Sequence, residues 1–396
     1  MVVNASRRLG ALVMVLVLVG LACSPPTSLP SSSAGTPAAP SAGGSGAVPS
    51  AGASGGPAIS DKLSAVYAAV EGLTGDARRT KLIELAKAEG GEVNVYTSTA
   101  LEESQPLTDA FTKATDIDVN LYRASAGTVL QRVTQEAQAS FQGGADAIAI
   151  NGPEMTILDS QKLLAPLKTP ATASILKEGV FDNWSAMYLN VFVAAWNKDK
   201  VSPDQAPKSY EDLFTKFKGR LGMELGDWDW FSTLVKYFVA KKGMTQEQAV
   251  DMFKNAAKGA RVVDGHSLMT ELLASGEFDV TASNYQHRVL QLLKDKAPIA
   301  WEPPIQPVVV RPNGIGISAT AARPASALLY LEYVLEEGQD LFLDLSRTPA
   351  STEALGGLNA SYEVLFTDVQ ALLNERDKWE GLYEEVVKES GKVIEQ

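Results

Sequence analysis

The sequence predicts an α/β protein with two doubly wound lobes, a two-strand hinge that joins them and a ligand cleft between them. Three observations predict this fold class. Strand and helix patterns alternate between residues 81 and 150, the alternation returns between residues 260 and 304, and an extended segment at 305–318 leads back to the first set. Such alternation indicates parallel sheets covered by helices, and a body of about 335 residues exceeds what one core usually fills.

The first lobe is predicted from three strand patterns with helices between them. The stretch "KLIELAKAEGGEVNVYTSTA" combines an amphipathic helix that ends at Gly90 and Gly91 with a strand of alternating Val93 and Val95. A helix at "PLTDAFTKAT" precedes the strand "IDVNLYRA". A helix at "SAGTVLQRVTQEAQASF" then precedes the fully apolar strand "ADAIAI".

The second lobe is predicted to follow a longer apolar strand, "MYLNVFVAAWNKDKV". A short helix and a strand come next in "SPDQAPKSYEDLFTKFKGRLGMEL", and helices follow at about 230–242 and 245–258. Residues 260–304 repeat strand, helix, strand, helix and strand, and helices dominate from Arg323 onward. We expect lobe 1 at 61–190, lobe 2 at 191–308, and the return to lobe 1 with C-terminal helices at 309–396, with the two crossovers near Leu189–Trp196 and Pro307–Ile317.

The N-terminal segment has the pattern of an export signal. Arg7 and Arg8 precede an apolar run, and the small residue Ala22 stands directly before Cys23, the only cysteine of the chain. The pattern resembles a bacterial lipoprotein signal, which implies a signal peptide at 1–22 and a lipid on Cys23; an ordinary secretory signal stays open as the alternative. Residues 23–60 are rich in Ser, Pro, Gly and Ala and predict a disordered tether.

The charge balance narrows the class of partner. The chain has 35 basic and 47 acidic residues, a formal net charge of -12. Nucleic-acid binding proteins present basic patches, so we expect no nucleic-acid partner. The sequence instead predicts an extracytoplasmic monomer, held at the cell membrane through its lipid anchor, that binds a small molecule and needs no cofactor.

Open α/β sheets bind ligands at the carboxyl ends of their strands, so the residues that follow each strand are the candidate site. In lobe 1 these residues are Thr97, Ser98, Thr99, Ser125, Ala126, Gly127, Thr128, Asn151, Gly152 and Glu154. In lobe 2 they are Asp227, Trp228, Asp229, Trp230, His266, Ser267, Asn284, Tyr285 and His287.

The residue types at these positions favour a small polar, anionic organic ligand. Ser125 to Thr128 open a helix, and a helix start offers N–H groups and a positive dipole end to an anion. Trp228, Trp230 and Tyr285 are candidates to cover apolar or ring surfaces of the ligand, although core packing of Trp230 is an equal alternative. Asp227 and Asp229 are the contrary evidence, because acids that face the cleft would favour a cationic or zwitterionic ligand.

The order of several short segments resembles a known family. "LAKAEGGEVNVYTS", "ADAIAI", "VAAWNKDKV", "SYEDLFTKFKGRLGM", "DWDWF", "LLASGEFDV", "GIGIS" and "RTPA" follow one another as in the extracellular solute-binding proteins of ABC importers, specifically the ferric-binding, type II periplasmic group. The resemblance covers roughly residues 80 to 355. It implies two lobes that close on a ligand and deliver it to the transmembrane subunits of an ABC permease.

Three functions stay open after this resemblance. The main prediction is a receptor for a small polar, anionic metabolite. Ferric-iron capture is the alternative, but ferric-binding members use adjacent tyrosines, and here Tyr285 is followed by Gln286; the chain's two histidines also lack zinc-type spacing, so we predict no metal ligands. A secreted hydrolase is the third possibility: "GHSLM" only approaches a nucleophile motif, and Ser267 is expected to cap a helix, so we predict no catalytic residues.

Overall fold

The computed structural model describes residues 60–352, 361–391 and 393–394 of the 396-residue chain. The predicted signal peptide, Cys23 and all but the last residue of the predicted tether lie outside these described residues. Among the described residues, no helix has both the length and the apolar character that crossing a bilayer requires.

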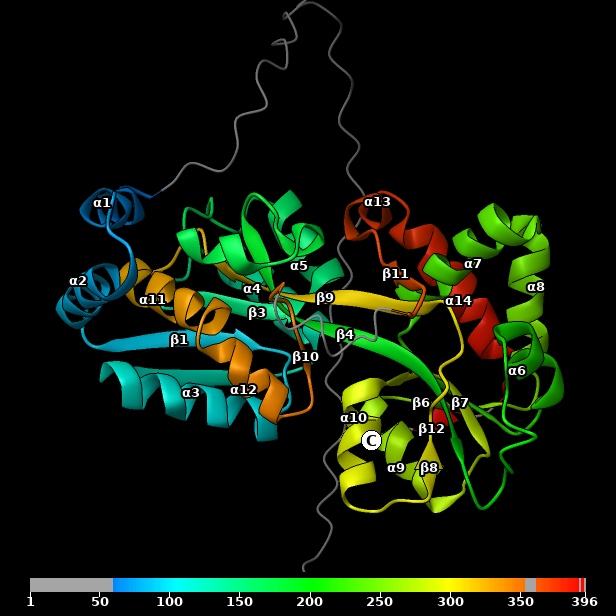
Figure 1. Cartoon of the computed structure of the whole chain (residues 1–396). Helices are drawn as coiled ribbons and strands as arrows, with labels where there is room; N and C mark the ends of the chain where they lie inside the picture. Colours follow the sequence, from blue (N-terminus) through cyan, green and yellow to red (C-terminus); the bar gives the residue numbers. More distant parts are fainter. Residues whose placement is uncertain (1–59, 353–360, 392, 395–396) are drawn as a thin grey trace, which may run out of the picture. The chain divides into compact units, whose positions relative to one another are not determined.

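The first lobe contains a parallel sheet in the order β3-β1-β2. A helix begins within four residues of the end of each of these strands, as the alternating pattern predicts (Figure 1). The elements are β1 (Glu92–Thr97), α3 (Leu101–Thr115), β2 (Asp118–Arg123), α4 (Ala126–Gln138), β3 (Ala147–Asn151) and α5 (Gly152–Ser160).

The second lobe contains a parallel sheet in the order β6-β5-β7, with β12 pairing on β6. Its helices α7 and α8 match the helices predicted at 230–242 and 245–258 to within two residues. The elements are α6 (Tyr210–Lys216), β5 (Leu221–Glu224), α7 (Trp228–Lys242), α8 (Gln246–Ala257), β6 (Arg261–Val263), α9 (His266–Ser275), β7 (Val280–Tyr285), α10 (Gln286–Lys294) and β12 (Val393–Ile394).

Two long strands join these sheets into one 12-stranded sheet. β4 (Trp184–Asn197) and β9 (Val308–Ile317) pair antiparallel with each other, β9 also pairs with β3, and β4 also pairs with β7 (Figure 1). The predicted fold class, two α/β lobes joined by two strands, is confirmed. Short strands extend this centre: β8 (Ile299–Ala300) and β10 (Thr348–Pro349) pair with β4, and β11 (Val364–Phe366) pairs with β9.

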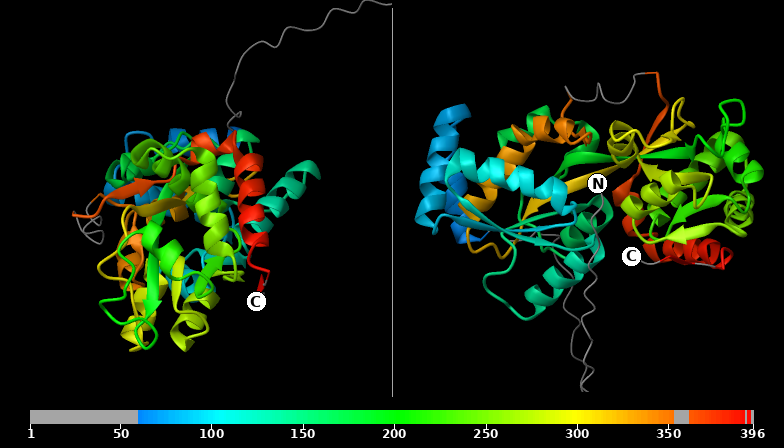
Figure 2. Two further views of the ribbon diagram at one scale, coloured as in Figure 1. Left: turned by 90° about the vertical axis from the view of Figure 1, so that its right-hand side faces the viewer. Right: turned by 90° about the horizontal axis from the view of Figure 1, so that it is seen from below.

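The remaining helices cover the two lobes. They are α1 (Asp61–Ala69), α2 (Gly75–Ala88), α11 (Pro324–Leu335), α12 (Gly338–Asp344), α13 (Val369–Leu373) and α14 (Arg376–Lys388), with 3₁₀ turns at Pro170–Ser174 and Lys177–Gly179. The helices α2 and α11 lie against each other, and α14 lies against α7 and α8 of the second lobe (Figures 1 and 2). The prediction places residues 309–396 in the return to lobe 1 with C-terminal helices, whereas α14 packs on helices of the second lobe. The exact lobe boundaries stay a prediction.

Each lobe has its own apolar core. Phe111 and Tyr330 meet edge to face in the first lobe, with ring centroids 5.1 Å apart. Trp230, Phe231 and Trp379 belong to the core of the second lobe, which α14 helps to close. Trp230 is fully buried there, so its aromatic ring packs in the core and does not cover a ligand.

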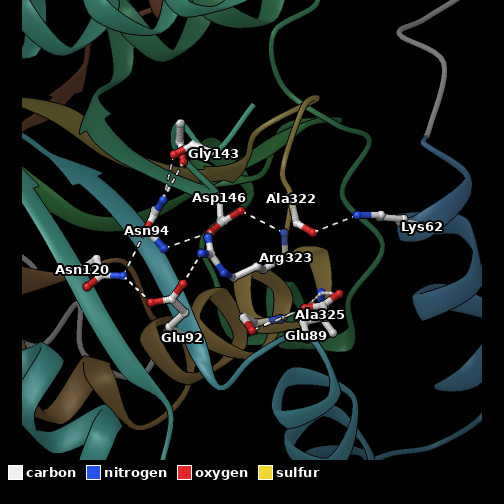
Figure 3. Close-up of polar contacts among 12 residues, drawn as sticks. Lys62, Glu89, Glu92, Asn94, Asn120, Gly143, Asp146, Ala322, Arg323 and Ala325 are labelled. Atoms are coloured by element: carbon white, nitrogen blue, oxygen red, sulfur yellow. Dashed lines mark hydrogen bonds and ion pairs between the residues drawn. The ribbon is translucent and has the colours of Figure 1, made fainter. Parts of the chain in front are cut away.

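A polar network ties the amino ends of the first-lobe strands together (Figure 3). Asp146, which is fully buried just before β3, accepts hydrogen bonds from the backbone N–H of Asn94 at 2.9 Å and from the backbone N–H of Arg323 at 3.0 Å. Arg323 also pairs with Asp146 and Glu92 through its guanidinium, and the Glu89 carboxylate accepts from the first N–H groups of α11. This network fixes the sheet edge opposite to the carboxyl ends of the strands.

Candidate functional site

The carboxyl ends of β5, β6 and β7 bring acidic and aromatic side chains to one edge of the second lobe. Glu224 is the last residue of β5, Asp227 stands directly before α7, and His266 is the first residue of α9, just after β6. Tyr285 ends β7. Because the three strands are parallel, their carboxyl ends meet at the same edge, where open α/β sheets bind ligands.

Glu224, Asp227 and His266 form a compact group that we call the carboxylate–histidine cluster. One ligand atom from each residue lies within 4.8 Å of the others. The Nε2 atom of His266 lies 3.1 and 3.2 Å from the two carboxylate oxygens of Asp227. The Glu224 carboxylate accepts from the backbone N–H groups of Gly226, at 2.5 Å, and Gly265, at 3.1 Å. Both carboxylates are therefore held in place beside the imidazole.

The charges of this cluster are strongly coupled. Burial and the neighbouring Asp227 carboxylate raise the pKa of Glu224 to about 7, although His266 and the two backbone N–H groups oppose the shift. Burial alone would lower the pKa of His266, but Asp227 and then Glu224 raise it above its ordinary value. With both carboxylates ionised, one imidazolium neutralises only one of them. In that state the cluster carries one uncompensated negative charge.

Arg311 of β9 reaches the same edge from the centre of the sheet. Its Nη1 donates to Asp229 Oδ2 at 2.8 Å, and its Nη2 donates to the Tyr285 hydroxyl. Arg311 and Asp229 are both buried. Asp229 is therefore neutralised by a fixed guanidinium, whereas the carboxylate–histidine cluster has no arginine or lysine of its own among its hydrogen-bond and ion-pair partners in the described residues.

The Tyr285 ring lies flat on the His266 imidazole. The ring centroids are 3.5 Å apart and the planes differ by 7°. The ring of Phe192 approaches both rings edge to face, at 5.9 Å from His266 and 5.3 Å from Tyr285. Burial raises the pKa of the Tyr285 phenol well above its ordinary value, while Arg311 opposes this shift. Tyr285 thus forms one wall of the cluster.

A second polar group lies where the first lobe meets the two central strands. Asn151 accepts from Asn190 at 3.3 Å and from Asn313 at 3.1 Å. Glu154 of α5 is partly buried, and its Oε2 has no hydrogen-bond partner within the described residues. Burial raises the pKa of Glu154, while the nearby Arg311 opposes this shift.

Polar contacts link α3 of the first lobe with α10 of the second. Two nitrogens of Arg347 donate to Glu103 Oε2, at 3.0 and 2.5 Å. From α10, Gln291 donates to Glu103 Oε1 at 3.3 Å, and His287 Nε2 lies 3.6 Å from the same oxygen. Burial and then Arg347 hold the pKa of His287 well below its ordinary value. His287 thus belongs to the contact between the lobes and not to the carboxylate–histidine cluster.

The predicted first-lobe residues divide into buried and exposed groups. The hydroxyl of Thr97 donates to the Ala149 carbonyl, and that of Thr99 hydrogen bonds with the Tyr188 hydroxyl at 3.1 Å, so both serve the framework. Ser98 is half-buried. Ser125 caps α4 by accepting from the Thr128 N–H, and a methyl group added at Gly127 would meet nothing within 4 Å. This helix start therefore faces open space, apart from the buried Ala126.

Several second-lobe predictions need correction. Trp228 and Trp230 pack in the apolar core. Ser267 was expected to cap α9, which is wrong: the cap is Gly265, whose φ of 99° favours glycine, and the helix already begins at His266. Asn284 is fully buried and bonds with Thr270 and Thr281, so it stabilises the fold. Gly152 of the first lobe is also structural, because a methyl group there would lie 2.9 Å from the Pro312 carbonyl oxygen.

Sequence reasoning missed Glu224 and Arg311. Glu224 was passed over because it is the last residue of a strand and not the first residue after it. Arg311 can be recognised in the sequence, because it is the single charged residue in the stretch "VVVRPNGIGIS". The prediction of no metal ligands rested on the spacing of histidines, and it could not detect one histidine that meets two carboxylates from other strand ends.

The fold and this edge define a receptor for a small solute, and comparison with known proteins identifies its family. Residues 107–362 match the family described as bacterial extracellular solute-binding protein, and the chain belongs to that family. This confirms the predicted family and the prediction that the chain is not an enzyme, which excludes the hydrolase alternative. Members of this family act outside the cytoplasm, as predicted.

Two curated relatives and one solved structure illustrate the similarity. The chain is 25% identical over 270 residues to iron uptake protein A1 of Synechocystis sp. (strain ATCC 27184 / PCC 6803 / Kazusa), covering 64% of this chain and 73% of the relative. It is 24% identical over 272 residues to the Fe(3+)-binding periplasmic protein of Serratia marcescens, covering 64% and 75%. The periplasmic binding protein AfuA of Actinobacillus pleuropneumoniae, solved with fructose-6-phosphate, superposes with a TM-score of 0.65 at 18% identity, covering 76% of this chain and 99% of AfuA.

Proposed function

We propose that this protein captures a metal cation, with iron as the first candidate, and delivers it to the membrane permease of an ABC importer. The observation that carries the proposal is the carboxylate–histidine cluster of Glu224, Asp227 and His266 at the ligand-binding edge of the second lobe. The metal is the transported solute and not a resident cofactor.

The donor atoms of the cluster fit a transition metal. Carboxylate oxygens and imidazole nitrogens together suit iron, manganese and zinc. Two ligands of one such ion lie up to about 4 Å apart, so donor atoms within 4.8 Å need only a small movement to meet one ion. The ion would take the place of the proton between His266 Nε2 and Asp227, and it would balance the second carboxylate as well.

The same charges disfavour the anionic organic ligand that the sequence predicts. Glu224 and Asp227 both belong to the cluster, and Arg311, whose charge also acts on Asp227 and His266, is paired with Asp229. The two curated relatives, an iron uptake protein and an Fe(3+)-binding periplasmic protein, support iron as the cation. The structure of AfuA with fructose-6-phosphate means that the fold alone does not select the ligand; the side chains at the strand ends do.

Binding assays with metals and organic anions test this proposal. We expect the wild-type protein to bind one Fe³⁺, Zn²⁺ or Mn²⁺ ion in native mass spectrometry and titration calorimetry, and the Glu224→Gln/Asp227→Asn double variant to lose at least tenfold in affinity. Asp264→Asn is the matched control, because Asp264 is an exposed acid next to the cluster. Selective binding of citrate or fructose-6-phosphate without any metal would refute the proposal and restore the anionic prediction.

We also propose that the protein is tethered to the membrane through a lipid on Cys23. This residue lies outside the described part of the chain, so the support is the sequence pattern around it. Cys23→Ser expressed in a bacterial host should move the protein from the membrane fraction to the soluble fraction, and mass spectrometry of the wild type should show acyl groups. A fully soluble wild type without acyl mass would contradict the tether.

A further inference from the structure

We infer that Tyr285 acts as an aromatic platform that positions His266 for the cation and that its hydroxyl is not a metal ligand. This inference deepens the proposed function and rests on it. It assigns to Tyr285 a positioning role, and it assigns the coordination of the cation to Glu224, Asp227 and His266.

The orientation of the His266 imidazole depends on its aromatic and carboxylate neighbours. His266 is the first residue of α9, and its N-cap is Gly265, which offers no side chain to hold it. Three contacts define the ring instead: the Tyr285 ring stacks on its face at 3.5 Å and 7°, the Phe192 ring approaches it edge to face at 5.9 Å, and Asp227 lies at its Nε2. Removing the aromatic ring of Tyr285 would take away the stacked contact and let the imidazole tilt away from the two carboxylates.

The Tyr285 hydroxyl lies beside the buried guanidinium of Arg311. This oxygen accepts a hydrogen bond from Arg311 Nη2. The guanidinium cannot retreat easily, because it is buried, paired with Asp229 at 2.8 Å and placed over the Phe192 ring at 5.0 Å from its centroid. A metal ion bound to the same oxygen would stand next to a permanent positive charge in a poorly solvated place. The electrostatics therefore direct the cation to the other side of His266.

The ring of Tyr285 and its hydroxyl therefore have different roles. The ring supports the metal site through stacking, whereas the hydroxyl completes the Arg311–Asp229 pair. A site without a phenolate ligand also has less preference for Fe³⁺ over divalent ions, because its donors are two carboxylates and one imidazole. We therefore expect Zn²⁺ and Mn²⁺ to compete measurably with iron for the site.

The test compares Tyr285→Phe, which keeps the ring, with Tyr285→Leu, which removes it. Affinities for Zn²⁺ and for Fe³⁺ supplied as ferric nitrilotriacetate are measured by chelator competition, together with visible absorption spectra of the iron-loaded proteins. We expect Tyr285→Phe to bind within about threefold of the wild type, Tyr285→Leu to bind at least tenfold more weakly, and no tyrosinate-to-iron absorption band. Tyr237→Leu is the control for loss of a tyrosine elsewhere in the second lobe.

The outcomes distinguish the inference from the proposed function. A charge-transfer band in the wild type that Tyr285→Phe abolishes would overturn the inference while leaving metal capture intact, as would a tenfold loss of affinity in Tyr285→Phe. Equal affinity of a folded Tyr285→Leu and the wild type would overturn the platform role. If the wild type bound none of these ions, the proposed function itself would fail.

Discussion

At the scale of single residues, the site depends on which buried charges have fixed partners. Asp229 has Arg311, at 2.8 Å, and Glu103 has Arg347. Glu224 and Asp227 share only His266. A buried carboxylate with an arginine partner stabilises the framework, whereas a pair of carboxylates that shares one imidazole stores an unfavourable charge. Under the proposed function, binding of the cation relieves that charge, so Glu224 and Asp227 differ from Asp229 and Glu103, whose charges are already balanced.

Glu224→Gln should change how the stability of the metal-free protein depends on pH. The pKa of Glu224 is raised from its ordinary value to about 7, so the folded state holds this proton more tightly than the unfolded state. The free energy of unfolding therefore falls as the pH rises from about 4.5 through 7. His266, whose pKa is also raised, contributes stability below its ordinary pKa that is lost in the same direction.

We measure the free energy of unfolding by urea in the presence of a chelator. From pH 5 to pH 8, the free energy of unfolding of Glu224→Gln should rise relative to that of the wild type by on the order of 1–3 kcal/mol. Glu102→Gln is the control, since Glu102 is exposed. If the free energies of unfolding of variant and wild type differed by the same amount at pH 5 and pH 8, this result would contradict the charge coupling in the cluster.

Arg311→Met should be strongly destabilising, because it leaves Asp229 buried without its partner. Removing one member of a buried ion pair costs about 3–5 kcal/mol. Urea unfolding of Arg311→Met, Asp229→Asn and the double variant measures this cost, and the double variant should lose less than the sum of the two single variants. Additive losses would mean that the two side chains do not act as a pair.

At the scale of elements, the centre of the molecule depends on how closely β4 and β9 approach each other. A methyl group at Gly314 of β9 would lie 2.3 Å from a ring atom of Trp184 on β4, so the two strands pack without room for a side chain there. The helix start of α4 is the opposite case, since Gly127 has open space around it. The same residue type therefore has different roles in these two elements.

Gly314→Ala should destabilise the protein by about 1–3 kcal/mol through overpacking of the central strands. Gly127→Ala should instead stabilise it by up to about 1 kcal/mol, because alanine favours a helix over glycine. Thermal unfolding of both variants at one pH checks this pair. A Gly314→Ala variant as stable as the wild type would show that β4 and β9 adjust freely.

At the level of the whole molecule, Glu103 is one of the points where polar side chains of the two lobes meet. Arg347 of the first lobe holds Glu103 on one side, and Gln291 and His287 of α10 approach it from the second lobe. These two α10 side chains can be removed without breaking the buried Glu103–Arg347 pair. The contact between the lobes can thus be weakened separately from the charge balance within the first lobe.

His287→Ala/Gln291→Ala should favour an open arrangement of the lobes in the metal-free protein, because α10 then makes no polar contact with Glu103. Small-angle scattering should show a larger radius of gyration than for the wild type, and saturating Zn²⁺ should reduce it. Lys378→Ala, a change on the outer face of α14, is the control. Identical scattering of the double variant and the wild type would exclude a role of this contact in closure.

The amino-acid sequence predicts the alternation of strands and helices and the two connecting strands, which the structure confirms, and it predicts the edge of the sheet at which a ligand would bind. These features follow from local periodicity and from residues that start and end helices, and both can be recognised along the chain. Asp227, His266 and Tyr285 are predicted as site residues in this way, because each lies at or just after a strand end. The position of a residue at an edge is a local property.

The pairing of the strands in space brings some of these residues together and keeps others apart. Glu224, Asp227 and His266 meet because β5 and β6 are neighbours in the sheet, and Arg311 neutralises Asp229 because β9 crosses from the other lobe. Trp230 lies in the core because Tyr210 and Phe253, which come from other helices, pack against its ring. The net charge at the candidate site is the sum over side chains that are distant in sequence. The pairing of the strands determines which side chains contribute to that sum.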